Sequence, residues 1–214
     1  MDSKEPGRRL FQSAENLRRS AADLSAILDY LWEKISDRRV DLGVVEDLGD
    51  ENNGGKSEWL ITTAFAYNAR IIEPAPSERG RGRPRNPHCR GTVTFMVRLC
   101  GTEDVPDPAP NWPWLVQACL IVGWHADEKE DCWEIVHFNP SDGEGFIRNE
   151  GGKVWSWHED GTDYSHFFVL PLFALQSEAD LDAQILEPLK VLFAGGDPDD
   201  AFPANSHALE PTTV

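Results

Sequence analysis

Apolar residues recur every three or four positions along the first 35 residues. Eight of them, spaced alternately by four and three, form one stripe: Leu10, Ala14, Leu17, Ala21, Leu24, Leu28, Leu31 and Ile35. A period of about 3.5 residues places all eight on one face of an α-helix. The sequence therefore predicts a long amphipathic helix within residues 1–38.

Two interpretations of this stripe stay open. It holds for almost four heptads, which is long enough for the seam of a coiled coil and would make the protein a homodimer. The interaction helix would then use its larger apolar residues, namely Leu17, Leu24, Leu28, Leu31 and Ile35. The alternative is a helix that lies on the protein's own sheet. The two alanines of the stripe favour this alternative, because they offer little area to a partner.

From residue 58 onward, the pattern becomes that of strands. Runs rich in β-branched and aromatic residues are predicted as strands at residues 59–72, 91–99, 115–125, 132–138, 146–149, 153–157 and 166–172. Gly151 and Gly152 supply the positive φ that a tight hairpin needs between the fifth and sixth runs. Short connections without helices predict an antiparallel meander of about six strands. Residues 39–57 are polar and turn-rich and are predicted to be an exposed linker.

A second helix is predicted near the C-terminus. Ser177 and Asp180 resemble a capping box, with Asp in place of Glu. The apolar stripe of this helix would comprise Leu181, Ile185, Leu189 and Leu192. Pro188 should kink the helix or mark its restart. Residues 195–214 are predicted to be an acidic, flexible tail.

The predicted fold class is therefore α+β. Its sheet is flanked in sequence by an N-terminal amphipathic helix and a C-terminal helix, and both helices are expected to cover the same face. Residues 58–194 and the N-terminal helix should form one globular domain.

Composition narrows the classes of partner. The formal net charge is −17 and the sequence pI is about 4.6, which favours solubility and opposes non-specific attraction to nucleic acid or anionic lipid. No apolar run approaches the roughly 20 residues that a membrane span needs, and the first residues lack a secretory signal. The four cysteines form no CxxC pair, so reduced thiols in a cytoplasm are expected. Another protein, or a second copy, is the expected partner.

One strongly basic segment stands out in this acidic chain. Residues 79–85 read Arg-Gly-Arg-Gly-Arg-Pro-Arg, and Arg90 follows. This segment resembles an AT-hook, whose central motif it matches at Arg81-Gly82-Arg83-Pro84, with Arg79 and Arg85 on either side. The resemblance implies insertion into the narrow minor groove of A·T-rich DNA, where negative potential attracts guanidinium groups. Two other interpretations are a solvated loop and a loop that pairs with an acidic face of this protein or of its twin.

A second pattern involves carboxylates and a lysine. Pro106-Asp107, followed by Asp127-Glu128-Lys129, resembles the Pro-Asp…(Asp/Glu)-x-Lys string of a large nuclease family. The resemblance implies that Asp107 and Asp127 hold Mg²⁺ and that Lys129 helps to activate water. The surrounding residues favour a charged turn instead, because residues 127–131 form the polar tip of a predicted hairpin.

Three histidines at the ends of predicted strands raise the question of a metal site: His125, His137 and His158. Their spacing matches no established zinc pattern, so ordinary sheet histidines are expected, with no metal and no cofactor.

Three hypotheses on function follow. The first is a non-catalytic interaction protein of the adaptor, immunity or chaperone-like kind. The second is a DNA-associated protein, and the third is a metal-dependent nuclease or hydrolase.

Overall fold

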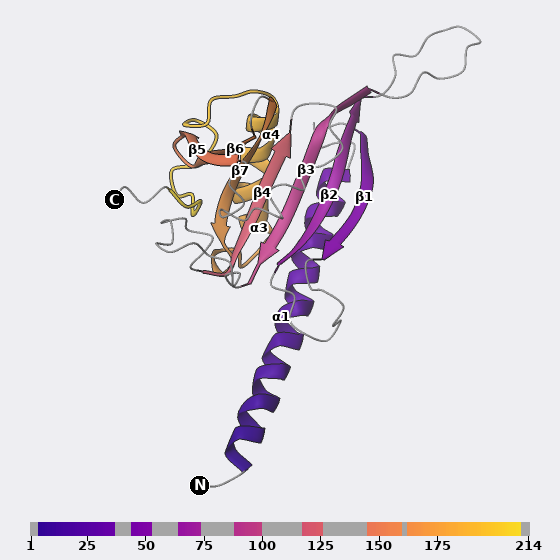
Figure 1. Cartoon of the computed structure of the whole chain (residues 1–214), viewed down its shortest axis with the longest axis vertical. Helices are drawn as coiled ribbons and strands as arrows, with labels where there is room; N and C mark the ends of the chain where they lie inside the picture. The colour runs from indigo at the N-terminus through magenta and orange to yellow at the C-terminus, as the bar shows by residue number, and fades with distance from the viewer. Residues whose placement is uncertain are drawn as a thin grey trace, which may run out of the picture.

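The predicted N-terminal helix is confirmed as α1 (Lys4–Ser36), which runs behind a twisted antiparallel sheet and projects beyond it (Figure 1). The computed structural model describes residues 4–36, 44–52, 64–73, 88–99, 117–125, 145–159 and 162–210. Residues 132–138, predicted as a strand, lie outside this set.

The sheet has seven strands, where the sequence predicts about six. Their bounds are β1 (Val44–Asn52), β2 (Ala64–Glu73), β3 (His88–Arg98), β4 (Cys119–His125), β5 (Gly145–Gly151), β6 (Val154–Glu159) and β7 (Thr162–Pro171). Every neighbouring pair is antiparallel, and the spatial order is β1-β2-β3-β4-β7-β6-β5. The antiparallel sheet is confirmed, but the topology is not one meander, because β7 rather than β5 lies beside β4.

Strand β1 occupies nine residues in the middle of the segment predicted as an exposed linker, residues 39–57. It pairs with β2 from Val44 opposite Ile72 to Asn52 opposite Phe65, with a shift in register between Asp47 and Gly49. The acidic, glycine-containing sequence of β1 hides it from a strand pattern. It is nevertheless suited to the edge of a sheet, because charged residues and bulges discourage a further strand from pairing there.

The predicted hairpin around Gly151 is confirmed as the connection from β5 to β6. Gly151 pairs with Val154, so only two residues make the turn. Gly152 has a φ of +47°, and a Cβ at this position would lie 2.8 Å from Oδ1 of Asp199. Glycine is therefore favoured here by its backbone conformation, whereas the exposed side chain of Asp199 could move aside for a Cβ.

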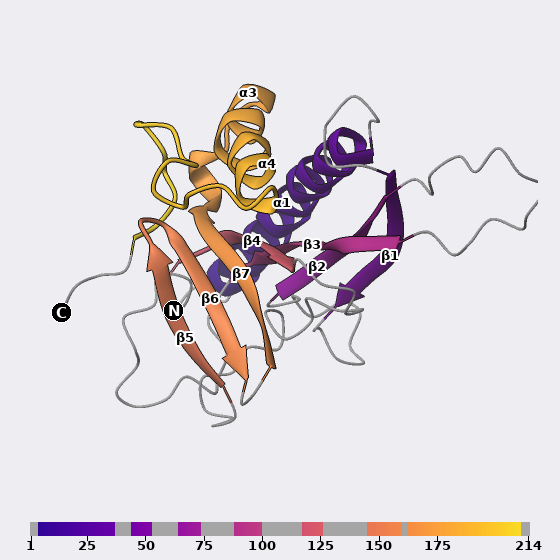
Figure 2. The same cartoon turned by 90° about the horizontal axis from the view of Figure 1, so that it is seen from above.

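The helices cover one face of the sheet, as predicted (Figure 2). Alternate residues of the central strands point toward them and join one buried cluster: Val93, Phe95, Val97, Leu120, Val122, Trp124, Phe168 and Leu170. The helices contribute Leu24, Leu31, Ile35, Leu181, Ile185 and Leu189. The alternation follows from the pleat of a strand, which turns every second side chain to the same face.

The C-terminal helical region begins at Ser177, as predicted. Its hydroxyl accepts a hydrogen bond from the backbone N–H of Asp180 (3.2 Å), while Asp180 accepts one from the backbone N–H of Gln176 (3.1 Å). The region then continues as α3 (Glu178–Leu181), the π-helical turn η3 (Asp182–Leu186) and α4 (Glu187–Phe193). The four residues of the predicted apolar stripe are buried.

Pro188 marks the restart of regular α-helix at α4, which is one of the two outcomes that the sequence predicts. In a regular α-helix its ring would clash with the carbonyl four residues earlier, at Gln184. The wider turn η3 contains Gln184 and lies just before α4, where Pro188 occupies one of the first two positions. A π turn adjusts the backbone locally, so the helix continues past the proline.

Residues 195–210 pack against the core, although the sequence predicts a flexible tail from residue 195. Ala201 and Ala208 are buried in the cluster. The ring of Phe202 packs edge-on against the ring of Phe168, with 5.1 Å between the two ring centres. The backbone N–H of Leu209 donates to the carbonyl of Val169 in β7 (2.8 Å). The segment therefore extends the core, and the prediction of a tail is wrong for these residues.

Candidate interaction surface

Helix α1 divides into two halves at Leu24, the first of its described side chains that is buried. In the second half, Leu24, Leu31 and Ile35 are at most 4% exposed and belong to the core. Burying such side chains fully contributes roughly 1.5–3 kcal/mol each. This half of α1 is therefore held firmly against the sheet by its apolar stripe.

A polar contact joins the same half to the C-terminal helical region. The hydroxyl of Tyr30 donates to Oδ1 of Asp182 (2.9 Å), and Nζ of Lys34 lies 5.0 Å from the centre of the Tyr30 ring. Burial, and then the carboxylate of Asp182, raise the pKa of Tyr30, while the hydrogen bond with Tyr30 raises the pKa of Lys34. The hydrogen bond is a polar contact that joins α1 to η3 beside the apolar packing.

The first half of α1, residues 4–23, projects from the body and is called the arm below (Figure 1). From Gly7 to Asp23, each side chain that the structure describes is exposed, apart from the half-buried Glu15. Leu10 is 73% exposed and Phe11 is 68% exposed. Two adjacent, largely exposed apolar side chains make this part of α1 a candidate surface for another molecule.

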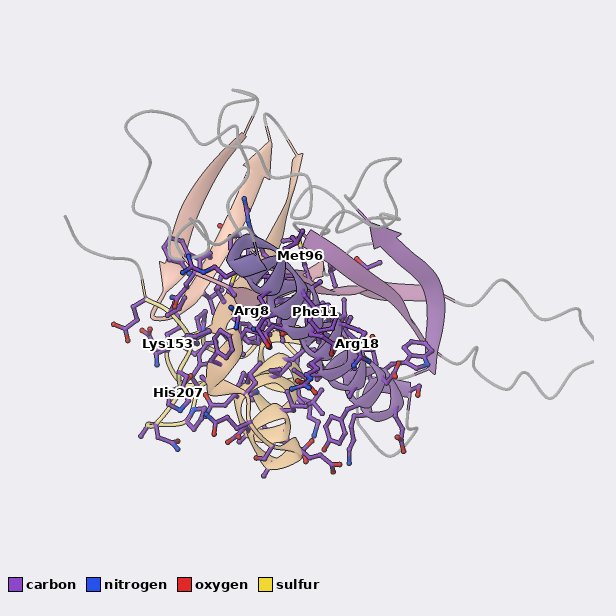
Figure 3. All side chains as sticks on the ribbon, turned by 90° about the horizontal axis from the view of Figure 1, so that it is seen from below. Arg8, Phe11, Arg18, Met96, Lys153 and His207 are labelled. Atoms are coloured by element: carbon purple, nitrogen blue, oxygen red, sulfur yellow. The ribbon has the colours of Figure 1, made fainter. Side chains whose placement is uncertain are left out.

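The arm is rich in arginine. Figure 3 views α1 from its N-terminal end, with Arg8, Phe11 and Arg18 labelled around it. Arg18 donates to Glu15 through Nε (3.4 Å) and Nη2 (3.1 Å), and Nε of Arg19 lies 3.9 Å from the same carboxylate. Exposed pairs of this kind stabilise a helix by only about 0.3–0.5 kcal/mol, so they support the arm without covering its apolar side chains.

The structure places the predicted interaction residues in two environments. Leu24, Leu31 and Ile35 are buried in the protein's own core, and Leu28 is partly buried against it. The interpretation of the stripe as a helix on its own sheet therefore holds for the second half. The side chain of Leu17 lies outside those that the structure describes, so its role in a seam stays a prediction.

The other predicted sites lie outside the described residues. This applies to residues 79–85 of the AT-hook-like segment, to Asp107, Asp127 and Lys129, and to His137. His125 is the last residue of β4, and His158 lies near the end of β6. The side chains of both histidines lie outside those that the structure describes. Among the described residues, no group of three or more His, Cys, Asp or Glu could hold a metal ion. These sites stay predictions.

Phe11 is not among the interaction residues predicted from the sequence, because it lies one position off the 4-3 stripe. Its only signal in the sequence is that it is an aromatic residue directly beside Leu10, at the start of the stripe. Its exposure in the structure makes it a candidate surface residue for contact with another molecule.

Comparisons of this chain with protein-family models, with curated proteins and with solved structures find no match. In the part of the chain that the structure describes, no helix combines the length and the apolar character needed to cross a membrane.

Proposed function

We propose that this chain is an interaction protein of the adaptor, immunity or chaperone-like kind, and that it docks through the arm of α1. The observation that carries the proposal is the exposure of Leu10 and Phe11 on a helix that projects from the body. Covering these two side chains would contribute roughly 1.5–3 kcal/mol each. That gain is comparable to the energy of a hot spot in a protein interface.

The preformed helix also supports docking. An isolated helix of this length is marginal in water, because its first turn is costly to form. The arm avoids that cost because it continues a helix whose second half is buried. A partner therefore meets an ordered surface and loses less conformational entropy on binding.

Affinity capture with the purified, tagged full chain tests this function. The double variant Leu10→Ser with Phe11→Ser removes the apolar surface of the arm. Phe173→Ser is the control, because Phe173 is 83% exposed but belongs to the turn Leu172–Ala174 and not to α1. A partner that the wild type and the control bind, and that the arm variant loses, supports docking through the arm.

Each captured partner is then purified and its affinity for the three proteins is measured by calorimetry. We expect the arm variant to bind at least about tenfold more weakly than the control. Equal binding by all three proteins would reject the arm as the docking element.

A further inference from the structure

We propose that the arm docks on a second copy of this chain, in a dimer whose two α1 helices run antiparallel. In this dimer, each arm lies beside an acidic surface made by residues 24–36 of the partner's α1 and by the first turns of its C-terminal helical region. The inference rests on the proposed docking function and names its partner.

Charge is distributed unevenly along α1 and its neighbours. The arm has five basic and three acidic residues, and the basic ones include Arg8, Arg9, Arg18 and Arg19. The acidic surface has the reverse balance: one lysine, Lys34, and five acids, namely Asp29, Glu33, Glu178, Asp180 and Asp182. The arm thus carries +2 and the acidic surface −4, within a chain of −17.

The five acids of this surface come from two elements that touch. Tyr30 of α1 is hydrogen-bonded to Asp182 at 2.9 Å. Nζ of Lys34, one turn further along α1, lies 5.0 Å from the centre of the Tyr30 ring. The acids of α1 and of the C-terminal helical region therefore belong to two elements that meet at Tyr30 and Asp182.

The distribution of charge selects the antiparallel orientation. A parallel pair would place arm beside arm and acidic surface beside acidic surface, so that like charges meet along its whole length. An antiparallel pair places each basic arm beside an acidic surface, and the same contact occurs twice. Such an arrangement has twofold symmetry and is closed, so it ends at a dimer.

The dimensions of α1 allow this arrangement. At 1.5 Å per residue, the arm is about 30 Å long and the second half of the helix is about 20 Å long, so the outer two thirds of each arm can lie along the second half of the other helix. Ser25 and Ala26 are exposed on the second half and have small side chains. They leave room for side chains of the arm of a second copy, and the surrounding charges fix the orientation.

Sedimentation and light scattering on the purified full chain test the proposal through charge reversal. The arm variant is Arg8→Glu with Arg9→Glu, and the acidic-surface variant is Asp29→Lys with Glu33→Lys. Both preserve the helix, because acids favour its N-terminal end and bases its C-terminal end. Far-ultraviolet circular dichroism checks that both variants fold.

We expect the wild type to dimerise and each double variant to do so at least about tenfold more weakly. The combined variant, with all four changes, regains the attraction in the antiparallel arrangement and should dimerise like the wild type. In a parallel pair it would still bring like charges together. An equimolar mixture of the two double variants should also form dimers.

Asp199→Lys with Asp200→Lys is the matched control for the acidic-surface variant. Both changes bring the net charge from −17 to −13, since each exchange adds two charges. If general repulsion between acidic chains controlled association, both variants would associate more tightly than the wild type, because both are less acidic. The proposal predicts weaker association for the acidic-surface variant alone, because the control residues are exposed but lie outside the docking surface.

A monomeric wild type at high micromolar concentration would overturn the proposal. So would a dimer that the arm reversal leaves intact, or a combined variant that stays monomeric. If the wild type is monomeric but its arm still captures a different protein, or vesicles of phosphatidylglycerol, the docking function stands and only the second copy is rejected. If replacing Leu10 and Phe11 changes no binding at all, the docking function fails as well.

Discussion

At the two ends of the chain, regular secondary structure and burial of side chains do not occur together. The arm is a regular helix, yet its described side chains are almost all exposed. Residues 195–210 contain no regular helix or strand, yet Ala201 and Ala208 are buried and Phe202 packs against the core. Apolar periodicity therefore indicates the kind of element, while burial depends on whether another part of the fold reaches it.

The largest expected effect comes from removing each end in turn. Deletion of residues 197–214 removes two buried alanines, Phe202 and the hydrogen bond from Leu209 to Val169. We expect it to lower the free energy of unfolding by about 4 kcal/mol. Deletion of residues 1–20 should change it by less than about 0.5 kcal/mol, because none of the side chains that the structure describes there is buried.

Urea unfolding at low protein concentration measures both deletions, since a dimer would make the apparent stability of the wild type depend on concentration. The contrast between the two ends would be wrong if removal of the arm destabilised the monomer as much as removal of the C-terminal segment.

These two segments also mark how far the sequence could predict the fold. The 4-3 stripe, the cap at Ser177 and the glycine turn at Gly152 are local signals, and the structure confirms each of them. Strand β1 was missed because an edge strand can be acidic, so it lacks the apolar alternation of a buried one. The packing of residues 195–210 depends on contacts with β7, which no local pattern records.

The candidate site was predicted in part. The stripe predicts the helix α1 and leaves open whether it is an interaction seam or lies on the protein's own sheet, and it could not show which of its residues, such as Leu24, Leu31 and Ile35, that sheet buries. The length of the sheet relative to the helix decides where the body ends and the arm begins. That length depends on the pairing of strands far apart in the sequence, so a local pattern cannot give it.

The next largest effect should separate the two halves of α1 by single substitutions. Leu31 is fully buried, so Leu31→Ala should lower the free energy of unfolding by about 3 kcal/mol through lost burial and a residual cavity. Leu10→Ala makes the same chemical change at a position that is 73% exposed, and it should alter stability by less than about 0.5 kcal/mol. Chemical denaturation of the two variants in parallel measures the difference. Similar losses would mean that Leu10 has a contact within the folded monomer.

A smaller effect should come from the polar contact that holds the second half in place. Tyr30→Phe keeps the ring and removes the hydroxyl that donates to Asp182, so we expect a loss of about 1 kcal/mol. The matched control is Phe11→Ala, which removes an exposed aromatic side chain from the arm and should leave the stability of the monomer unchanged within about 0.5 kcal/mol. Thermal unfolding checks both. An unchanged midpoint for Tyr30→Phe would show that apolar packing alone fixes α1 against the C-terminal helical region.

The smallest effect concerns the start of the C-terminal helical region and its dependence on pH. The hydroxyl of Ser177, and then the backbone N–H of Gln176, lower the pKa of Asp180 because they donate to its charged form. A lowered pKa in the folded state stabilises the protein above the ordinary pKa of Asp, about 3.9. This stabilisation is lost as the pH falls through the folded value. Asp180→Asn should therefore lower the urea midpoint at pH 7 and lower it less at pH 3. A difference of the same size at both pH values would show that the amide and the carboxylate differ only in shape.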